Sequence, residues 1–263
     1  MNKPVILNSI IALLTVFTLN TAYASEEVVG GQVVSNQDLI SQRTVGLFMK
    51  IGNGAAICSG EIIDSSHILA AAHCVTNFES GYVVFSTGDI TTILKTNPSV
   101  ARKITGAKAM PGYDGETGGS GEFADFSIIT FSGGLESGYE PAHFLPQSIL
   151  KTKLKVSTAI TLAGYGITNP PTQSPGAGWQ GAGILRKVNV KLAQIGGQKI
   201  DMYLQGQTGH IACEGDSGGP AMIAVSGDEY VIGVDSRGNC QDLAIYGIVS
   251  KEMVDSFVSS VSF

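Results

Sequence analysis

Residues 212–220 read ACEGDSGGP, a composition that suits neither a helix nor a central strand. A serine hydroxyl becomes a nucleophile when a base lies within hydrogen-bond reach and a third group orients that base. Acyl transfer also needs N–H donors aimed at the developing oxyanion. The glycines around Ser217 allow backbone N–H groups to approach a substrate closely. Gly-Asp-Ser-Gly also occurs in ordinary turns, so this motif alone is only moderate evidence for a nucleophile. The base that a nucleophilic serine needs must come from elsewhere in the chain.

The candidate base is His73, one of four histidines, which stands in LAAAHCV beside Cys74. A single histidine in this position is more often a core residue with satisfied hydrogen bonds than a base. The candidate orienting acid is Asp125, which precedes the apolar run of ADFSIITF and is therefore expected to be partly buried. A buried carboxylate needs a hydrogen-bonding partner, although an aspartate here also suits the cap of a strand or turn.

The composition indicates a folded protein of one large or two small domains. The chain has 263 residues, of which 43% are hydrophobic and 14% charged, the opposite of a disordered chain. Its formal net charge is −6 and it contains no basic cluster, so we expect no nucleic-acid partner. We find no cofactor motif, and we expect neither a cofactor nor a bound metal.

Residues 1–24 have the pattern of a secretory signal peptide. Lys3 is followed by a mostly apolar run over residues 5–19, and Ala22 and Ala24 occupy the positions that a signal peptidase reads. The run is short for a membrane anchor, and no later stretch is long and apolar enough to span a bilayer. We therefore expect cleavage after Ala24, a secreted or periplasmic location, and no membrane association after signal removal.

The sequence contains four cysteines, Cys58, Cys74, Cys213 and Cys240. In an oxidising compartment an even number suggests two disulfides, and four cysteines allow three pairings. Their spacing matches no common zinc-site pattern, so metal ligation is the weaker interpretation.

The elements that must position these residues are short β-branched runs separated by turn residues. Examples lie at 45–51, 81–86, 160–163, 186–191 and 230–234, and this spacing predicts an all-β barrel or sandwich. Residues 111–121 and 168–183 are expected to be surface loops. One helix is expected at the C-terminus, where Val254, Phe257, Val258 and Val261 share one face.

Taken together, these segments resemble the chymotrypsin-like (trypsin-fold) serine proteases. CSGEIIDSSHILAAAHCV is similar to the family's histidine segment, PGYD with ADFSIITF to its aspartate segment, and ACEGDSGGP to its serine segment. The order His, Asp, Ser is the family's order and differs from that of subtilisins and α/β-hydrolases. The match runs from Val28 nearly to the end of the chain.

The resemblance implies an all-β fold of two packed six-stranded Greek-key β-barrels with a C-terminal helix. The protease domain would cover residues 28–263, with the N-terminal barrel at 28–140 and the C-terminal barrel and helix at 141–263. The implied disulfides are Cys58–Cys74 and Cys213–Cys240.

The resemblance also implies a role for each candidate residue. Ser217 would be the nucleophile, His73 the general base, and Asp125 the group that orients the imidazole. The N–H groups of Gly215 and Ser217 would form the oxyanion hole. The implied partners are protein or peptide substrates, and we expect a monomer.

Asp216 would pair with an α-amino group that proteolysis creates. Val28 begins a VVGG segment similar to the family's mature start, which makes residues 25–27 a propeptide. The family's usual basic residue before this bond is replaced by Glu27, so the activating protease would not be trypsin-like. Alternatively, Ser25 remains the N-terminus and activity arises in another way.

The substrate pocket is expected to be apolar. The family's pocket floor falls on Ile211, where trypsin-like members place an acid, and the wall positions fall on Ser236, Gly238 and Ala244. A cationic side chain would lose its hydration there without a counter-charge, so we expect cleavage after apolar residues, an elastase- or chymotrypsin-like preference. Arg237 replaces the family's aromatic residue, and it either favours acidic residues further along the substrate or partly fills the cleft.

Two functions remain open at this point. The first is an exported serine endopeptidase that acts through an acyl-enzyme and is made as a zymogen. The second is a protease-fold binding protein that has lost catalysis, although all three triad residues are present. A lipase or esterase of the α/β-hydrolase fold is excluded by the chain order and by the lack of alternating helices.

Overall fold

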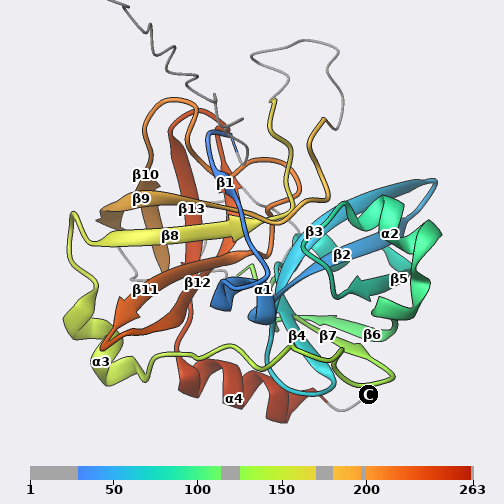
Figure 1. Cartoon of the computed structure of the whole chain (residues 1–263). Helices are drawn as coiled ribbons and strands as arrows, with labels where there is room; N and C mark the ends of the chain where they lie inside the picture. The colour runs from blue at the N-terminus through green and yellow to red at the C-terminus, as the bar shows by residue number, and fades with distance from the viewer. Residues whose placement is uncertain (1–28, 114–124, 170–179, 197–199, 262–263) are drawn as a thin grey trace, which may run out of the picture.

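A computed structural model of the chain describes residues 29–113, 125–169, 180–196 and 200–261. The signal peptide, the propeptide and Val28 lie outside these residues, as do most positions of the two predicted surface loops. Figure 1 shows two β-barrels beside each other, with the helix α4 (Lys251–Ser260) below them.

The first barrel is a closed ring of six antiparallel strands in the order β2-β3-β4-β7-β6-β5. β2 closes the ring because it pairs with β3 on one side and with β5 on the other. The strand bounds are β2 Thr44–Ile51, β3 Gly54–Ile62, β4 His67–Ala70, β5 Phe78–Val84, β6 Ala101–Ala109 and β7 Ser127–Phe131.

The second barrel closes in the same manner, in the order β8-β9-β10-β13-β12-β11, through the pairing of β8 with β9. The predicted fold class of two six-stranded barrels is therefore confirmed. The short strand β1 (Gln32–Val33) pairs with β9 and so joins the second barrel. The strand bounds are β8 Ala159–Gly164, β9 Arg186–Ile195, β10 Asp201–Gln205, β11 Pro220–Val225, β12 Asp228–Gly238 and β13 Leu243–Ile248.

The helices are more numerous than the sequence predicted. The expected C-terminal helix is present as α4, which buries Val254 and Phe257 and begins after Ser250, whose hydroxyl accepts the N–H of Met253. Three short helices were not predicted because none is long enough to show apolar residues at i, i+3, i+4 and i+7. They are α1 Leu39–Arg43, α2 Ile90–Thr96 and α3 Gln147–Lys153, and two 3₁₀ turns accompany them, η1 His73–Val75 and η2 Pro98–Val100.

The two barrels share apolar packing. One buried cluster contains Leu47 and Ile128 of the first barrel together with Met222 and Val234 of the second. The C-terminal helix contributes Phe257 to the same cluster. The barrels are therefore held against each other by a continuous hydrophobic interior, which fixes the position of any site between them.

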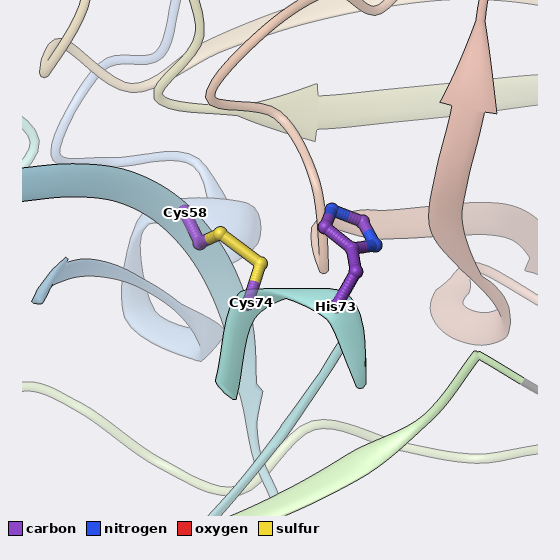
Figure 2. A group of neighbouring side chains, drawn as sticks. All are labelled: Cys58, His73 and Cys74. Carbon is purple, nitrogen blue, oxygen red and sulfur yellow. A yellow bond between two sulfur atoms is a disulfide. The ribbon is translucent and has the colours of Figure 1, made fainter. Parts of the chain in front are cut away.

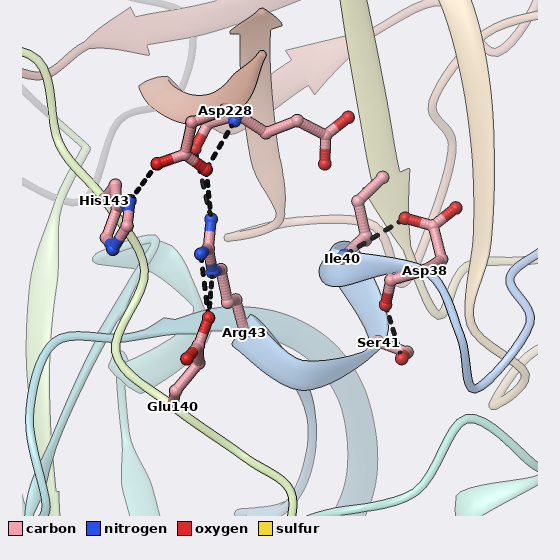
Figure 3. Close-up of polar contacts among 8 residues, drawn as sticks. Asp38, Ile40, Ser41, Arg43, Glu140, His143 and Asp228 are labelled. Carbon is pink, nitrogen blue, oxygen red and sulfur yellow. Dashed lines mark hydrogen bonds and ion pairs between the residues drawn. The ribbon is translucent and has the colours of Figure 1, made fainter.

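A buried arginine adds a polar tie between the barrels (Figure 3). Arg43 of α1 donates from Nε to Glu140, at 2.9 Å, and from a terminal nitrogen to Asp228, at 3.1 Å. Asp228 begins β12 and also bonds His143. Glu140 and His143 belong to the connection between β7 and β8, so this connection is fixed to both barrels. The predicted domain division between residues 140 and 141 falls in this connection and stays a prediction.

Candidate active site

The register of two strands brings His73 and Asp125 together. His73 opens the turn η1 just after β4, and Asp125 lies just before β7. β4 pairs with β7 so that Ala70 lies opposite Ser127. The Asp125 carboxylate accepts the backbone N–H of His73 at 2.9 Å, and its second oxygen lies 2.6 Å from Nδ1 of the ring.

The environment of Asp125 keeps its carboxylate ionised. The residue is 5% exposed, and burial alone raises its pKa, but the hydrogen bonds and charge of His73 and the hydroxyl of Ser236 lower the pKa below its usual value. Ser236 Oγ donates to Asp125 Oδ2 at 2.8 Å. An ionised Asp125 holds the proton of the imidazole on Nδ1, which leaves Nε2 as the acceptor nitrogen.

Ser217 lies in the loop between Cys213 and β11, and this loop packs against the turn that carries His73. The carbonyl of Ser217 accepts the N–H of Ser59 at 2.8 Å, and it lies 3.7 Å from Sγ of Cys74, the residue after His73. At Gly218 a Cβ would lie 2.9 Å from the nitrogen of Ala71. Glycine is required at this close approach, which places the Ser217 backbone beside the histidine turn.

Three backbone N–H groups of the serine loop have no partner within the described part of the chain, those of Glu214, Gly215 and Ser217. Gly215 has φ +95°, and a Cβ there would lie 2.9 Å from Cα of Gly166. Its carbonyl accepts the hydroxyl of Ser59 at 3.0 Å, which fixes the orientation of this peptide. Gly215 and Ser217 therefore present available donors, one on each side of Asp216.

Asp216 points inward, away from Ser217. Its two oxygens accept the N–H groups of Gly166 and Cys213, each at 2.8 Å, and the residue is 1% exposed. Burial raises its pKa to about 6, and these hydrogen bonds reduce the rise. Val28, the predicted partner, lies outside the described residues. The next residue, Val29, is buried beside Cys213, and its carbonyl accepts the N–H of Ile211 at 3.0 Å.

Both disulfides of the structure match the pairing that the resemblance implies. Cys58 is bonded to Cys74 and Cys213 to Cys240. Figure 2 shows the first disulfide next to the ring of His73. Although these three residues are close enough to suggest a metal-binding group, the two sulfur atoms are bonded to each other and are not thiolate ligands. The disulfide instead anchors the backbone on the C-terminal side of His73.

The four predicted pocket residues occupy different environments. Ile211 and Ala244 are buried in the apolar cluster of the second barrel, and Gly238 is exposed at the end of β12. Ser236 is 5% exposed and bonds Asp125. Arg237 donates to Asp201 at 2.8 Å and to the Ser236 hydroxyl at 3.2 Å.

Sequence reasoning missed three residues at this site. Asp201 was not predicted as a partner of Arg237, and the spacing of these residues gives no signal for it. Asp235 and Tyr246 are both buried and were not considered. Asp235 did carry a signal, because an aspartate at the end of the apolar run YVIGVD requires a buried partner.

Comparison with known proteins agrees with this geometry. A protein-family model described as Trypsin matches residues 29–257. The chain belongs to the trypsin family. A curated relative of this trypsin-family chain is the CLIP domain-containing serine protease B4 of Anopheles gambiae, 26% identical over 240 residues. The alignment covers 81% of this chain and 63% of that protein.

Among the described residues, no helix has the length and apolar character needed to span a membrane.

Proposed function

We propose that this chain is an exported serine endopeptidase that hydrolyses peptide bonds through a covalent acyl-enzyme. The observation that carries the proposal is the paired contact of Asp125 with His73, through both the ring Nδ1 and the backbone N–H. Membership of the trypsin family supports a peptide-hydrolysing activity. Ser217, in the loop packed against the His73 turn, is the proposed nucleophile.

The proposed reaction has two halves, formation of the acyl-enzyme and its hydrolysis, and the same groups act in both. His73 Nε2 takes the proton of the Ser217 hydroxyl as its oxygen attacks the peptide carbonyl, and then gives this proton to the leaving amine. The N–H groups of Gly215 and Ser217 stabilise the oxyanion. Water, activated by the same imidazole, then releases the acyl group. Asp125 stays ionised throughout and stabilises the imidazolium.

We propose that activation requires a free amino group at Val28. Asp216 is a buried carboxyl with two N–H donors and a pKa raised by burial, so it gains from a cation placed next to it. The burial of Val29 beside Cys213 supports an N-terminal segment that enters this region. The proposal includes the signal peptide at 1–24, the propeptide at 25–27 and a separate activating protease.

The apolar character of Ile211, Gly238 and Ala244 supports apolar contact with the residue before the cleaved bond. Burial of a side chain there would contribute about 25 cal/mol per Å² of apolar surface. This preference rests on the predicted floor, Ile211, and on two wall positions, and a buried acid of β12 is considered below.

The test is labelling with a fluorophosphonate, which reacts with an activated serine. The purified processed chain should be labelled stoichiometrically at Ser217, Ser217→Ala should be unlabelled, and Ser99→Ala, at an exposed serine, should be labelled like the wild type. Absence of labelling in a folded chain that begins at Val28 would favour a protease-fold binding protein without catalysis.

The activation proposal has its own test. N-terminal sequencing of the active form should give Val28, and acetylation of this amine should abolish activity. A chain that begins at Ser25 and cleaves peptides at full rate would contradict it.

A further inference from the structure

Asp235 is a buried acid directly beside the serine loop, and the proposed mechanism does not use it. Its carbonyl accepts the N–H of Gly218 at 2.9 Å, and its own N–H donates to the carbonyl of Gly219 at 2.9 Å. It is 4% exposed and lies one residue before Ser236, the partner of Asp125. The strand β12 therefore carries Asp235 alongside the segment that follows Ser217.

The register of β12 and β13 shows which way Asp235 points. The register shifts between Asp235 and Arg237, so Ser236 lies at an irregularity and turns towards Asp125. Asp235 pairs with Tyr246 of β13, and directly paired residues place their side chains on the same face of a sheet. Tyr246 belongs to the apolar cluster that contains Ile211 and Ala244. Asp235 therefore faces the predicted pocket residues.

Two residues on this face each have a buried polar atom without a partner. Within the described part of the chain, neither Oδ1 of Asp235 nor the hydroxyl of Tyr246 has a hydrogen-bond partner. By contrast, both carboxyl oxygens of Asp125 and both of Asp216 accept hydrogen bonds. Since buried polar atoms are normally paired, an unpaired carboxyl oxygen beside an unpaired hydroxyl indicates a position that a ligand fills.

We propose that Asp235 binds the cationic end of a lysine or arginine side chain before the cleaved bond. The inference rests on the proposed protease function and names the substrate class of that site. The aliphatic part of such a side chain would lie along Ile211 and Ala244, and cleavage after a cationic residue would replace the apolar preference expected from these two residues alone. The cation would reach Oδ1 of Asp235, beside the hydroxyl of Tyr246. The acid that trypsin-like members place at the position of Ile211 would thus be supplied from the pocket wall.

The charges around the site favour a cation over a neutral polar group. Asp125 and Asp216 both interact electrostatically with Asp235, so three carboxyl groups surround the serine loop. Asp125 is paired with His73, and Asp216 has its two N–H donors. Arg237, further along the same strand, is held by Asp201 and Ser236. Of these three acids, Asp235 alone has a buried carboxyl oxygen that lacks a hydrogen-bond partner within the described residues.

The same surroundings predict how binding depends on pH. Burial, and next the charges of Asp216 and Asp125, raise the pKa of Asp235 well above its usual value. Burial and the nearby Asp235 also raise the pKa of Tyr246, so this hydroxyl keeps its proton. A lysine substrate must therefore bind the ionised form of Asp235, and its affinity should increase as the pH rises and Asp235 loses its proton.

The experiment compares two peptides that differ only before the cleaved bond, where one has lysine and the other norleucine. The two side chains share an aliphatic stem and differ in the ammonium group. Hydrolysis is measured with the wild type, and binding with Ser217→Ala by calorimetry. We expect the lysine peptide to be favoured by at least about tenfold in both, and Asp235→Asn to lower the lysine-to-norleucine ratio by about 10²-fold. Glu61→Gln, which alters a buried acid of the first barrel, should leave the ratio unchanged.

The two measurements separate this inference from the proposed catalysis. Hydrolysis that favours norleucine, or an Asp235→Asn ratio equal to that of the wild type, would overturn the inference while the protease function stands. Binding of the lysine peptide by Ser217→Ala, without hydrolysis by the wild type, would support the inference and contradict the catalysis. If Asp235→Asn does not fold, equal or weaker binding of the lysine peptide by Ser217→Ala still overturns the inference.

Discussion

The two barrels have the same strand order but opposite hydrogen-bond states at the site. Each ring runs first, second, third, sixth, fifth and fourth strand, so the chain repeats one topology twice. The first barrel contributes His73 and Asp125, which are joined to each other. The second contributes the serine loop, whose N–H groups at Gly215 and Ser217 have no partner among the described residues, and Asp235, whose Oδ1 likewise has none there.

This difference suggests a division of labour between the barrels. The groups that must be held at a fixed distance for proton transfer find their partners within the protein. The groups that must meet a substrate are left without partners until the substrate arrives. One observation limits the rule, because Glu61 in the first barrel also has an unpaired oxygen. The predictions below test whether the division holds, from the largest expected effect to the smallest.

The largest effect is expected when the contact between His73 and Asp125 in the first barrel, called the paired half of the site below, is removed. Asp125→Asn should lower kcat by about 10⁴-fold, because an amide does not hold the proton of the imidazole on Nδ1. Asp64 forms a similar pair with His67 in the same barrel, with 2.8 Å between the carboxylate and Nδ1. Asp64→Asn should therefore leave kcat unchanged. Equal losses in the two variants, measured by steady-state hydrolysis, would show that the Asp125 effect is structural.

The next largest effect is expected for the disulfides. Cys58–Cys74 lies in the first barrel and Cys213–Cys240 in the second. They close loops with sequence separations of 16 and 27 residues, so loop-closure entropy predicts about 3 kcal/mol of stability for each. Replacing either pair by alanine should lower the free energy of unfolding by similar amounts in denaturant titrations. The lysine-to-norleucine ratio should change only without Cys213–Cys240, which holds the serine loop. A change of this ratio without Cys58–Cys74 would contradict the division.

The sequence was sufficient for the fold and for the positions that hold the paired half. Short β-branched runs predicted strands at β2, β5, β8, β9 and β12, and the motif around His73 identified a candidate base whose contacts with Asp125 the structure describes. These features are encoded locally or in family motifs. The short helices were missed because they depend on caps such as Asp89, which accepts the N–H groups of Thr91 and Thr92.

The serine loop and Asp235 of the second barrel, the unpaired half of the site, were much less predictable. Their contacts depend on the register between segments that are distant in the sequence. Asp235 faces Tyr246 only through the pairing of β12 with β13, and no spacing in the sequence encodes that pairing. The contact of Arg237 with Asp201 crosses β13, which lies between their strands. The buried Ile211 was identified from the serine motif alone, whereas the acid opposite the pocket needed the structure.

Glu61 tests whether a buried acid outside the site acts on stability alone. Burial raises its pKa well above the usual value, and the Thr44 hydroxyl and the charge of Arg43 oppose the rise only in part. The folded protein thus retains a proton that the unfolded chain releases above a pH of about 4.3. The contribution of Glu61 to stability should be greatest below this pH and should fall by up to about 1.4 kcal/mol per pH unit until the folded pKa is reached.

Glu61→Gln should remove this contribution, so the free energy of unfolding should depend less on pH between 5 and 7. Denaturant titrations at several pH values measure it. Asp235→Asn should flatten the same curve, but it alone should also change substrate preference. A changed lysine-to-norleucine ratio in Glu61→Gln would mean that a buried acid of the first barrel also affects substrate preference. The division of labour between the barrels would then be contradicted.

The smallest effect is expected at Arg237, where the two halves meet. Its guanidinium reaches Asp125 only through the Ser236 hydroxyl, and its ion pair with Asp201 is partly exposed, with 28% and 16% of the two side chains accessible. A pair of this kind contributes at most about 1 kcal/mol, so Arg237→Gln should lower kcat about two- to fivefold. KM should stay unchanged if Arg237 acts as a positioning residue, and Arg237→Lys should restore part of kcat. The exposed pair of Lys50 and Glu79 provides the control, since Glu79→Gln should change neither constant. A rise in KM confined to peptides with acidic residues would instead mean that Arg237 contacts substrate, and the arginine would then belong with the unpaired half.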